Sequence, residues 1–295
     1  MQIGNRGLNN KLKNSDYSDD LKSLLYLLEF KTAWLLEKHE LNNIDDIEGI
    51  GLQIIAKCTK ALKTLSTVCT ICKDYSVANT TLRMIIDSIA IYNIVYAIPD
   101  KEEREYRHYL YIKDGIKSRL STMEDELEYT GGISVEEFVR LQKRYKDTKT
   151  SDLSAIQHCN DILNKHSYST LYSEFHKQTI EHCNWRYKDN IYKSKINQNR
   201  YSWEELYVLL DPRKEIYTFI STHLTQFSHG FCVSNIVIEE TSSDFNPILS
   251  FGIVAAGILQ KFLKAMYPDD DSCYRAFLKS PHFKRFKINI DKKLI

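Results

Sequence analysis

The chain contains few of the residues that interrupt regular structure. It has 10 glycines and 5 prolines among 295 residues, about 5% together, where globular proteins average about 12%. Folds with many strands need frequent turns, and glycine and proline are the residues that mark most of them. The shortage argues against a β-rich or α/β fold and favours long helices joined by few connections.

Long hydrophobic runs are also missing. The two most apolar stretches are residues 82–98, which contain Arg83, Asp87 and Asn93, and residues 248–259. Both fall short of the roughly 20 apolar residues that a membrane helix needs. The first 20 residues include no apolar segment of the kind that directs secretion. We therefore expect a cytoplasmic protein that has no membrane partner.

The sequence lacks the usual patterns for metals and cofactors. Its seven cysteines are odd in number and widely spaced, which predicts reduced thiols. Cys69 and Cys72 lie within one predicted helix and have no second pair, which favours core packing. The histidines and cysteines between residues 158 and 183 do not have zinc spacing, and neither a Glu-x-x-His pair nor a glycine-rich phosphate loop occurs. No cofactor is expected, and a metalloenzyme is the least favoured class.

Apolar residues recur at helical spacing through most of the chain. With 43% hydrophobic residues and a net charge of +1, the chain can bury a sizeable core. The fold class predicted is all-α, as a single multi-helix bundle domain of about seven or eight helices. The predicted segments are a disordered N-terminal segment (1–17), the domain (18–278) and a basic C-terminal tail (279–295). The longer predicted helices cover residues 19–40, 45–73, 76–97, 101–129, 134–166, 211–230 and 247–267.

Arg83 and Asp87 stand four residues apart on the most apolar predicted helix. Charges in such a helix are costly unless they are paired or used. The two readings are an ion pair that locks the bundle and a polar site that faces a cleft. His229 ends a later predicted helix, where it either caps that helix or joins the pair as an acid/base and anion-binding group. The candidate catalytic residues are therefore Arg83, Asp87 and His229.

Three of these features together carry a family resemblance. The Arg-x-x-x-acidic pattern of Arg83 and Asp87, Trp185 before a basic segment, and the Ser-His-Gly helix end at residues 228–230 resemble a group of uncharacterised bacterial all-helical proteins. The resemblance spans about residues 50–232. It implies an α-helical fold with a polar cluster and no established activity. In that group Glu commonly stands where this chain has Asp87.

A second resemblance concerns the HEPN ribonucleases, which are small helical bundles. Their signature is an arginine followed after four to six residues by a histidine on the same helix. Arg275 and His282 have this spacing, although Pro281 interrupts the helical register immediately before the histidine. The resemblance implies a metal-independent HEPN-like ribonuclease as the alternative function.

Residues 184–201 read NWRYKDNIYKSKINQNRY and combine basic and aromatic side chains. This mixture suits phosphate contacts and base stacking, although an ordinary solvated loop has the same composition. The C-terminal segment adds further cations that could belong to a surface for an anionic partner. The candidate nucleic-acid-binding residues are Trp185, Arg186, Lys188, Lys193, Lys195 and Arg200. The C-terminal cations are Lys279, Lys284, Arg285, Lys287, Lys292 and Lys293.

The leading hypothesis is a bacterial helical protein of the antiphage-defence, toxin or stress-response kind that acts by binding. Its expected partner is nucleic acid or another anionic molecule, and homo-oligomer formation stays open. Convergence of Arg83, Asp87 and His229 on an open cleft would favour a nuclease. Burial or separation of these residues would favour binding.

Overall fold

Helices make up almost all of the regular structure. A computed structural model describes residues 17–41, 43–124, 126–167, 179–188, 200–211, 213–228, 244–268 and 271–294. Within these ranges the single β-type pairing is an isolated bridge between Tyr187 and Arg200. The predicted all-α class is confirmed.

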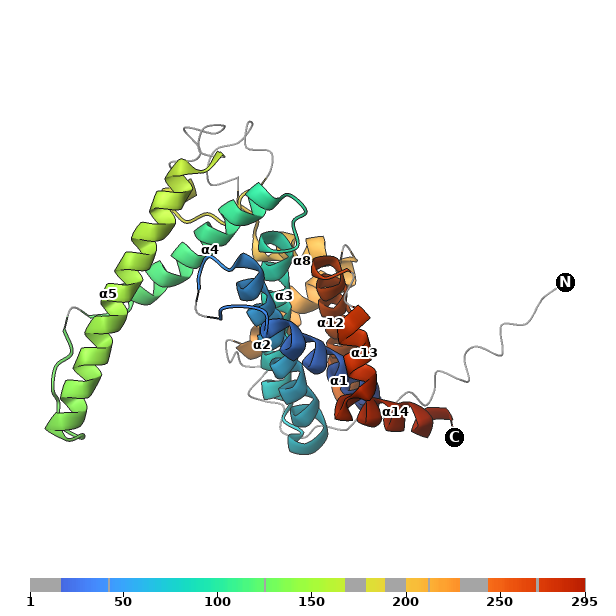
Figure 1. The fold of residues 1–295 in the computed structure, drawn as a ribbon. Coiled ribbons are helices and arrows are strands. Elements are labelled where there is room, and N and C mark those ends of the chain that lie inside the picture. Colours follow the sequence, from blue (N-terminus) through green and yellow to red (C-terminus); the bar gives the residue numbers. More distant parts are fainter. Residues whose placement is uncertain are drawn as a thin grey trace. The chain divides into compact units, whose positions relative to one another are not determined.

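The chain divides into two compact units, and one continuous stretch forms the second. Unit 1 comprises Met1–Asn93 and Trp203–Ile295, and unit 2 comprises Ile94–Ser202 (Figure 1). The described residues contain eleven α-helices and two π-helices, so a single domain with seven or eight helices is not confirmed. Unit 1 holds α1 (Tyr17–Leu36), α2 (Ile47–Thr67), η2 (Val68–Cys72), nearly all of α3 (Tyr75–Val95), α8 (Trp203–Leu210), α9 (Lys214–Thr218), η5 (Phe219–Leu224), α10 (Thr225–Ser228), α12 (Phe245–Met266), α13 (Asp271–Lys279) and α14 (Pro281–Leu294). Unit 2 holds α4 (Lys101–Ser121) and α5 (Val135–Lys165).

The core of unit 1 is built on α1, α2 and α12, which pack against one another. Leucines recur at helical spacing on the faces that these helices bury, and Leu21 and Leu28 of α1 are fully buried. Gly252 allows α12 to come close. A Cβ atom at this position would lie 3.2 Å from Leu21 and 3.3 Å from Leu65. The glycine therefore fixes the depth at which α12 sits against the other two helices.

By length and composition α12 is long and apolar enough to cross a membrane, and it is the one helix in the described ranges for which this holds. Its buried residues include Ile248, Leu249 and Leu259. An apolar helix of this length is also found at the centre of many helical bundles.

Unit 2 is organised by the packing of α4 on α5. Ser134 and Glu137 form the predicted capping box at the start of α5. Asp152 of α5 is buried and accepts hydrogen bonds from Arg119 of α4. At 1.5 Å per residue, the 31 residues of α5 and the 21 of α4 span about 46 and 31 Å. Since α5 is longer than α4, part of it is not covered by α4. The first half of α5 is exposed, with Val135 and Val139 on its surface.

Three stretches differ from the predicted elements. The helix expected over residues 101–129 ends at Ser121, as α4. The helix expected over residues 211–230 is divided into α9, η5 and α10, and α9 begins only at Lys214. The segment expected to be a basic tail is helical as α14, which packs on α1. Its aromatic side chains also pack on α13, since the Phe283 and Phe286 rings both lie about 6 Å from the Phe277 ring.

Candidate functional site

Arg83 and Asp87 form the predicted ion pair on α3. The Nε atom of Arg83 donates to Oδ2 of Asp87 at 3.1 Å. Only 14% of the Arg83 side chain and 30% of the Asp87 side chain are exposed. The expected pairing and the substantial burial of the arginine are both confirmed.

The pair is completed by residues far along the chain. The Nη1 atom of Arg83 donates to the backbone carbonyl of Ile220 in η5 and, at 3.0 Å, to the hydroxyl of Thr225 in α10. The hydroxyl of Tyr207 in α8 donates to Oδ1 of Asp87 at 2.7 Å. The Arg83 guanidinium also lies 4.9 Å from the centre of the Tyr207 ring. Sequence reasoning missed these three partners, because no local pattern links them to α3.

This geometry is typical of an ion pair that holds helices together and not of an active site. Burial raises the pKa of Asp87, while the hydrogen bond from Tyr207 and the charge of Arg83 act in the opposite direction. Both carboxylate oxygens are engaged within unit 1, and the arginine joins α3 to η5 and α10. His229 lies outside the described residues. The open catalytic cleft that would favour a nuclease is thus not formed by Arg83 and Asp87 themselves.

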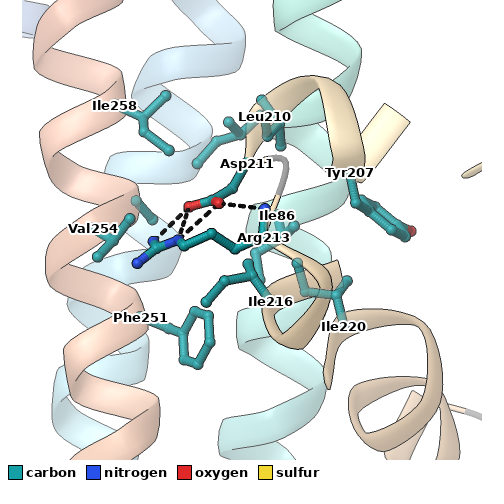
Figure 2. Close-up of a pocket in the computed structure, with 12 residues that line it drawn as sticks. Ile86, Tyr207, Leu210, Asp211, Arg213, Ile216, Ile220, Phe251, Val254 and Ile258 are labelled. Carbon is teal, nitrogen blue, oxygen red and sulfur yellow. Dashed lines mark hydrogen bonds and ion pairs between the residues drawn. The ribbon is translucent and has the colours of Figure 1, made fainter. Parts of the chain in front are cut away.

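An apolar pocket adjoins the cluster, since Tyr207 and Ile220 line both (Figure 2). Its cavity volume is about 60 Å³, room for about two water molecules or a small apolar group. Arg213 donates to the carboxylate of Asp211 at the exposed edge of the pocket, and these bonds lower the pKa of Asp211 to about 2. The other lining residues are Ile86, Ile89, Leu210, Ile216, Phe251, Val254, Ala255 and Ile258.

A second polar chain in unit 1 links Asp46, His39 and Tyr267. Asp46 contacts Nδ1 of His39 at 2.8 Å, and Nε2 of His39 lies 2.6 Å from the hydroxyl of Tyr267. The order resembles that of an acid, a base and a nucleophile. However, burial raises the pKa of Tyr267 to about 12, whereas an activated nucleophile needs a lowered pKa. Asp46 also caps α2, so the chain ties the start of α2 to the end of α12.

Cys69 and Cys72 are both free thiols. Burial raises the pKa of Cys69 to about 12, while Cys72 is exposed. Among the described residues no group of three or more His, Cys, Asp and Glu side chains is placed to hold a metal ion.

Arg275 and His282, the pair with HEPN spacing, stand on separate helices. α13 ends at Lys279 and α14 begins at Pro281. Arg275 is exposed, whereas the His282 ring lies against the aromatic rings of Tyr26 and Phe30 on α1. The two side chains therefore do not share the helix on which the HEPN signature depends.

Trp185 is an interior residue of unit 2. It is 5% exposed, and its indole N–H donates to Asp114 at 2.9 Å. Arg107 of α4 donates to the carbonyls of Trp185 and Tyr187, both at 3.0 Å, and its guanidinium lies 3.7 Å from the centre of the Tyr187 ring. In this position Trp185 offers no face to a nucleic-acid base. Its prediction as a stacking residue is therefore not supported by its surroundings.

The structure describes three of the other candidate nucleic-acid-binding residues of this segment, namely Arg186, Lys188 and Arg200. Tyr187 pairs with Arg200 in the isolated bridge, and the amide of Tyr201 donates to the carbonyl of Arg186 at 2.8 Å, which joins the two ends of the segment. Lys188 lies over the Tyr201 ring at 5.4 Å and Arg186 over the Trp185 ring at 5.5 Å, while Arg200 is exposed. Lys193 and Lys195 lie outside the described residues.

A group of exposed cations lies on α13 and α14. Five exposed cations, which we call the α13–α14 basic surface, have no ion-pair partner among the described residues. No acidic residue occurs between Ser272 and Lys287. Tyr274, beside these cations on α13, is 59% exposed. The surface consists of Arg275, Lys279, Lys284, Arg285 and Lys287.

Comparison with protein-family models, with curated proteins and with solved structures gave no match. The chemistry of the residues themselves is therefore the basis for a functional assignment.

Proposed function

We propose that this chain is a binding protein for single-stranded nucleic acid and that the α13–α14 basic surface is its binding site. The observation that carries the proposal is a set of five exposed cations that have no ion-pair partner in the part of the chain that the structure describes and no acid between them in the sequence. Such cations attract phosphate groups and release counterions from the nucleic acid when they bind.

An exposed aromatic ring favours nucleic acid over other polyanions. Tyr274 is one residue before Arg275 and four before Leu278, and both Tyr274 and Leu278 are exposed. A ring next to cations can stack on an unpaired base while the cations contact the backbone. The surface also has a firm support, because the Phe277 ring of α13 lies 5.5 Å from the Phe30 ring of α1.

Binding is favoured over catalysis because the polar cluster of Arg83 and Asp87 is engaged internally. The wider role that we propose is a cytoplasmic one in bacterial defence, toxin action or stress response. No contact among the described residues favours the HEPN-like ribonuclease.

Fluorescence anisotropy with a labelled single-stranded oligonucleotide, at several salt concentrations, tests the proposal. The triple variant Lys284→Ala, Arg285→Ala, Lys287→Ala should bind more weakly. If each cation contacts one phosphate, the slope of log K against log salt should fall by about 2, since each contact contributes about 0.7. The variant Tyr274→Ala should weaken binding with little change in slope, because stacking is not ionic.

Matched controls come from unit 2. The triple variant Arg140→Ala, Lys143→Ala, Arg144→Ala removes the same charge from exposed positions of α5. The variant Tyr129→Ala removes another exposed tyrosine. Both should keep wild-type affinity. Equal losses in the control and test variants would contradict the assignment to α13 and α14.

A further inference from the structure

A second cavity lies in unit 1 where α1 packs on α12. It has a volume of about 180 Å³ and is lined by Leu27, Leu28, Lys31, Gln260, Leu263 and Lys264. Leu28 and Leu263 are fully buried and close it on the side of the core. Each helix also supplies one lysine, so the lining combines leucine side chains with two cations.

The lining is positively charged and includes no carboxylate. Neither Lys31 nor Lys264 has an ion-pair or hydrogen-bond partner among the described residues. Lys264 stands in the last turn of α12, where its charge also complements the helix dipole. That effect gives no reason for a second lysine to stand across the same cavity, because two like charges repel. A bound anion removes this repulsion.

Gln260 adds an independent indication of a missing ligand. Its Nε2 atom is buried, and none of the residues that the structure describes accepts a hydrogen bond from it. Buried N–H groups without an acceptor are rare in proteins because they lose their bonds to water and gain nothing in return. The amide lies one turn before Lys264, in the same wall of the cavity. An oxyanion supplies the acceptor that this wall lacks.

We propose that this cavity binds the phosphate group of a small molecule. Lysine ammonium groups are compact point charges that bind phosphate. A phosphate monoester carries about −1.5 to −2 charges at neutral pH, which balances two lysines, whereas one carboxylate balances only one of them. The volume corresponds to about six water molecules, enough for a phosphate and a small part of the group attached to it. The site is separate from the α13–α14 basic surface and does not depend on the function proposed for it.

Thermal unfolding of the full chain in inorganic phosphate, at constant ionic strength, tests the proposal. A ligand that binds only the folded state raises the melting temperature. Phosphate should therefore raise it, whereas sodium chloride and sodium acetate at the same ionic strength should not. Lys31→Met and Lys264→Met keep the aliphatic contacts of the stems and should each weaken phosphate binding at least about tenfold, as expected for a lost charge-assisted hydrogen bond.

Two further variants separate a built site from general charge effects. Lys261→Met removes an exposed lysine of α12 that does not line the cavity, and it should retain the full phosphate shift. Gln260→Leu should lose the shift without lowering the melting temperature in phosphate-free buffer, because it removes a buried donor that no described residue satisfies. A phosphate shift that is absent from the wild type, or equal in Lys261→Met and Lys264→Met, would overturn the proposal.

Oligonucleotide binding distinguishes a small molecule from a nucleic-acid backbone as the source of the phosphate. Lys31→Met and Lys264→Met should leave the affinity for the labelled oligonucleotide unchanged. Should both variants weaken oligonucleotide and phosphate binding alike, the cavity would belong to the nucleic-acid surface and the separate site would be excluded.

Discussion

At Asp87, burial and pairing act on the same carboxyl group in opposite directions. Burial is the larger effect and raises its pKa above 3.8. A pKa that is higher in the folded than in the unfolded state means that the folded state holds the proton more tightly. The resulting stabilisation is complete below about pH 3.8 and is lost as the pH rises through the folded-state pKa.

This difference predicts a pH dependence. Relative to the Asp87→Asn variant, which cannot ionise at this position, the wild type should lose stability as the pH rises above 3.8. Urea unfolding of both proteins at a series of pH values measures the difference in unfolding free energy. A difference that stays constant across this range would show that the carboxyl group has the same pKa in both states.

Removing the carboxylate of Asp87 tests how much the ion pair with Arg83 contributes to the free energy of unfolding. Asp87→Ala leaves the Arg83 guanidinium without its carboxylate, and we expect a loss of about 1–3 kcal/mol, between the values for exposed and fully buried pairs. Glu29→Ala breaks the pair of Glu29 with Lys63, whose lysine is 66% exposed, and should cost less than about 1 kcal/mol. Denaturant titrations compare the two; equal losses would mean that burial adds nothing at Asp87.

One contact of this cluster, the pairing of Arg83 with Asp87, could be predicted from the sequence. Arg83 and Asp87 are four residues apart, so helical geometry alone brings them together. Thr225 is 142 residues from Arg83 in the chain, and its contact depends on the folding of unit 1. Similarly, the composition around Trp185 indicated an exposed basic segment. The buried Arg107 that binds its carbonyl comes from a different helix, and nothing in the local pattern reveals it.

Among the elements, α12 contains two glycines in contrasting surroundings. A side chain at Gly252 would meet Leu21 and Leu65 at once, whereas nothing lies within 4 Å of a Cβ at Gly257. Gly252→Leu should overpack the core and cost about 1–3 kcal/mol or more. Gly257→Ala should stabilise by about 0.5–1 kcal/mol, because alanine loses less backbone entropy in a helix. Calorimetric melts of both variants should shift in opposite directions, and a stabilising Gly252→Leu would contradict the close approach of α12.

Element types were more predictable than their interruptions. Apolar spacing predicted the long helices, and the Ser134 capping box marked the start of α5 because its chemistry is local. The π-helix η5 was not predicted. Its turn depends on a distant side chain, since the carbonyl of Ile220 accepts hydrogen bonds from both Arg83 and Thr225. The spacing of apolar residues at a period of 3.6 does not predict such a contact.

For the whole molecule, the division into two units follows from two separate cores. This division could not be predicted from the sequence, because no linker marks either boundary and α3 continues across the first one. Leu62 in unit 1 and Leu163 in unit 2 are both fully buried. Replacing either with alanine should cost about 2–5 kcal/mol, but each should lower the stability of its own unit.

Fluorescence of Trp185 reports the second unit, since this tryptophan is buried there. Leu163→Ala should shift the thermal transition seen by Trp185, in a background where Trp34 and Trp203 are replaced by phenylalanine. Leu62→Ala should mainly shift the remaining transition seen by circular dichroism. A single transition that moves equally in both variants would show one cooperative fold.

The discontinuity of unit 1 has a consequence for the protein as it leaves the ribosome. α1 and α2 emerge early, but α12, which covers their leucines, begins about 180 residues after α2 ends. At ordinary rates of translation this interval lasts about 10–40 s. The intervening residues include the whole of unit 2, which can therefore finish folding while the first two helices still expose an apolar face. For that interval the nascent chain presents the kind of surface that chaperones bind and that leads to aggregation.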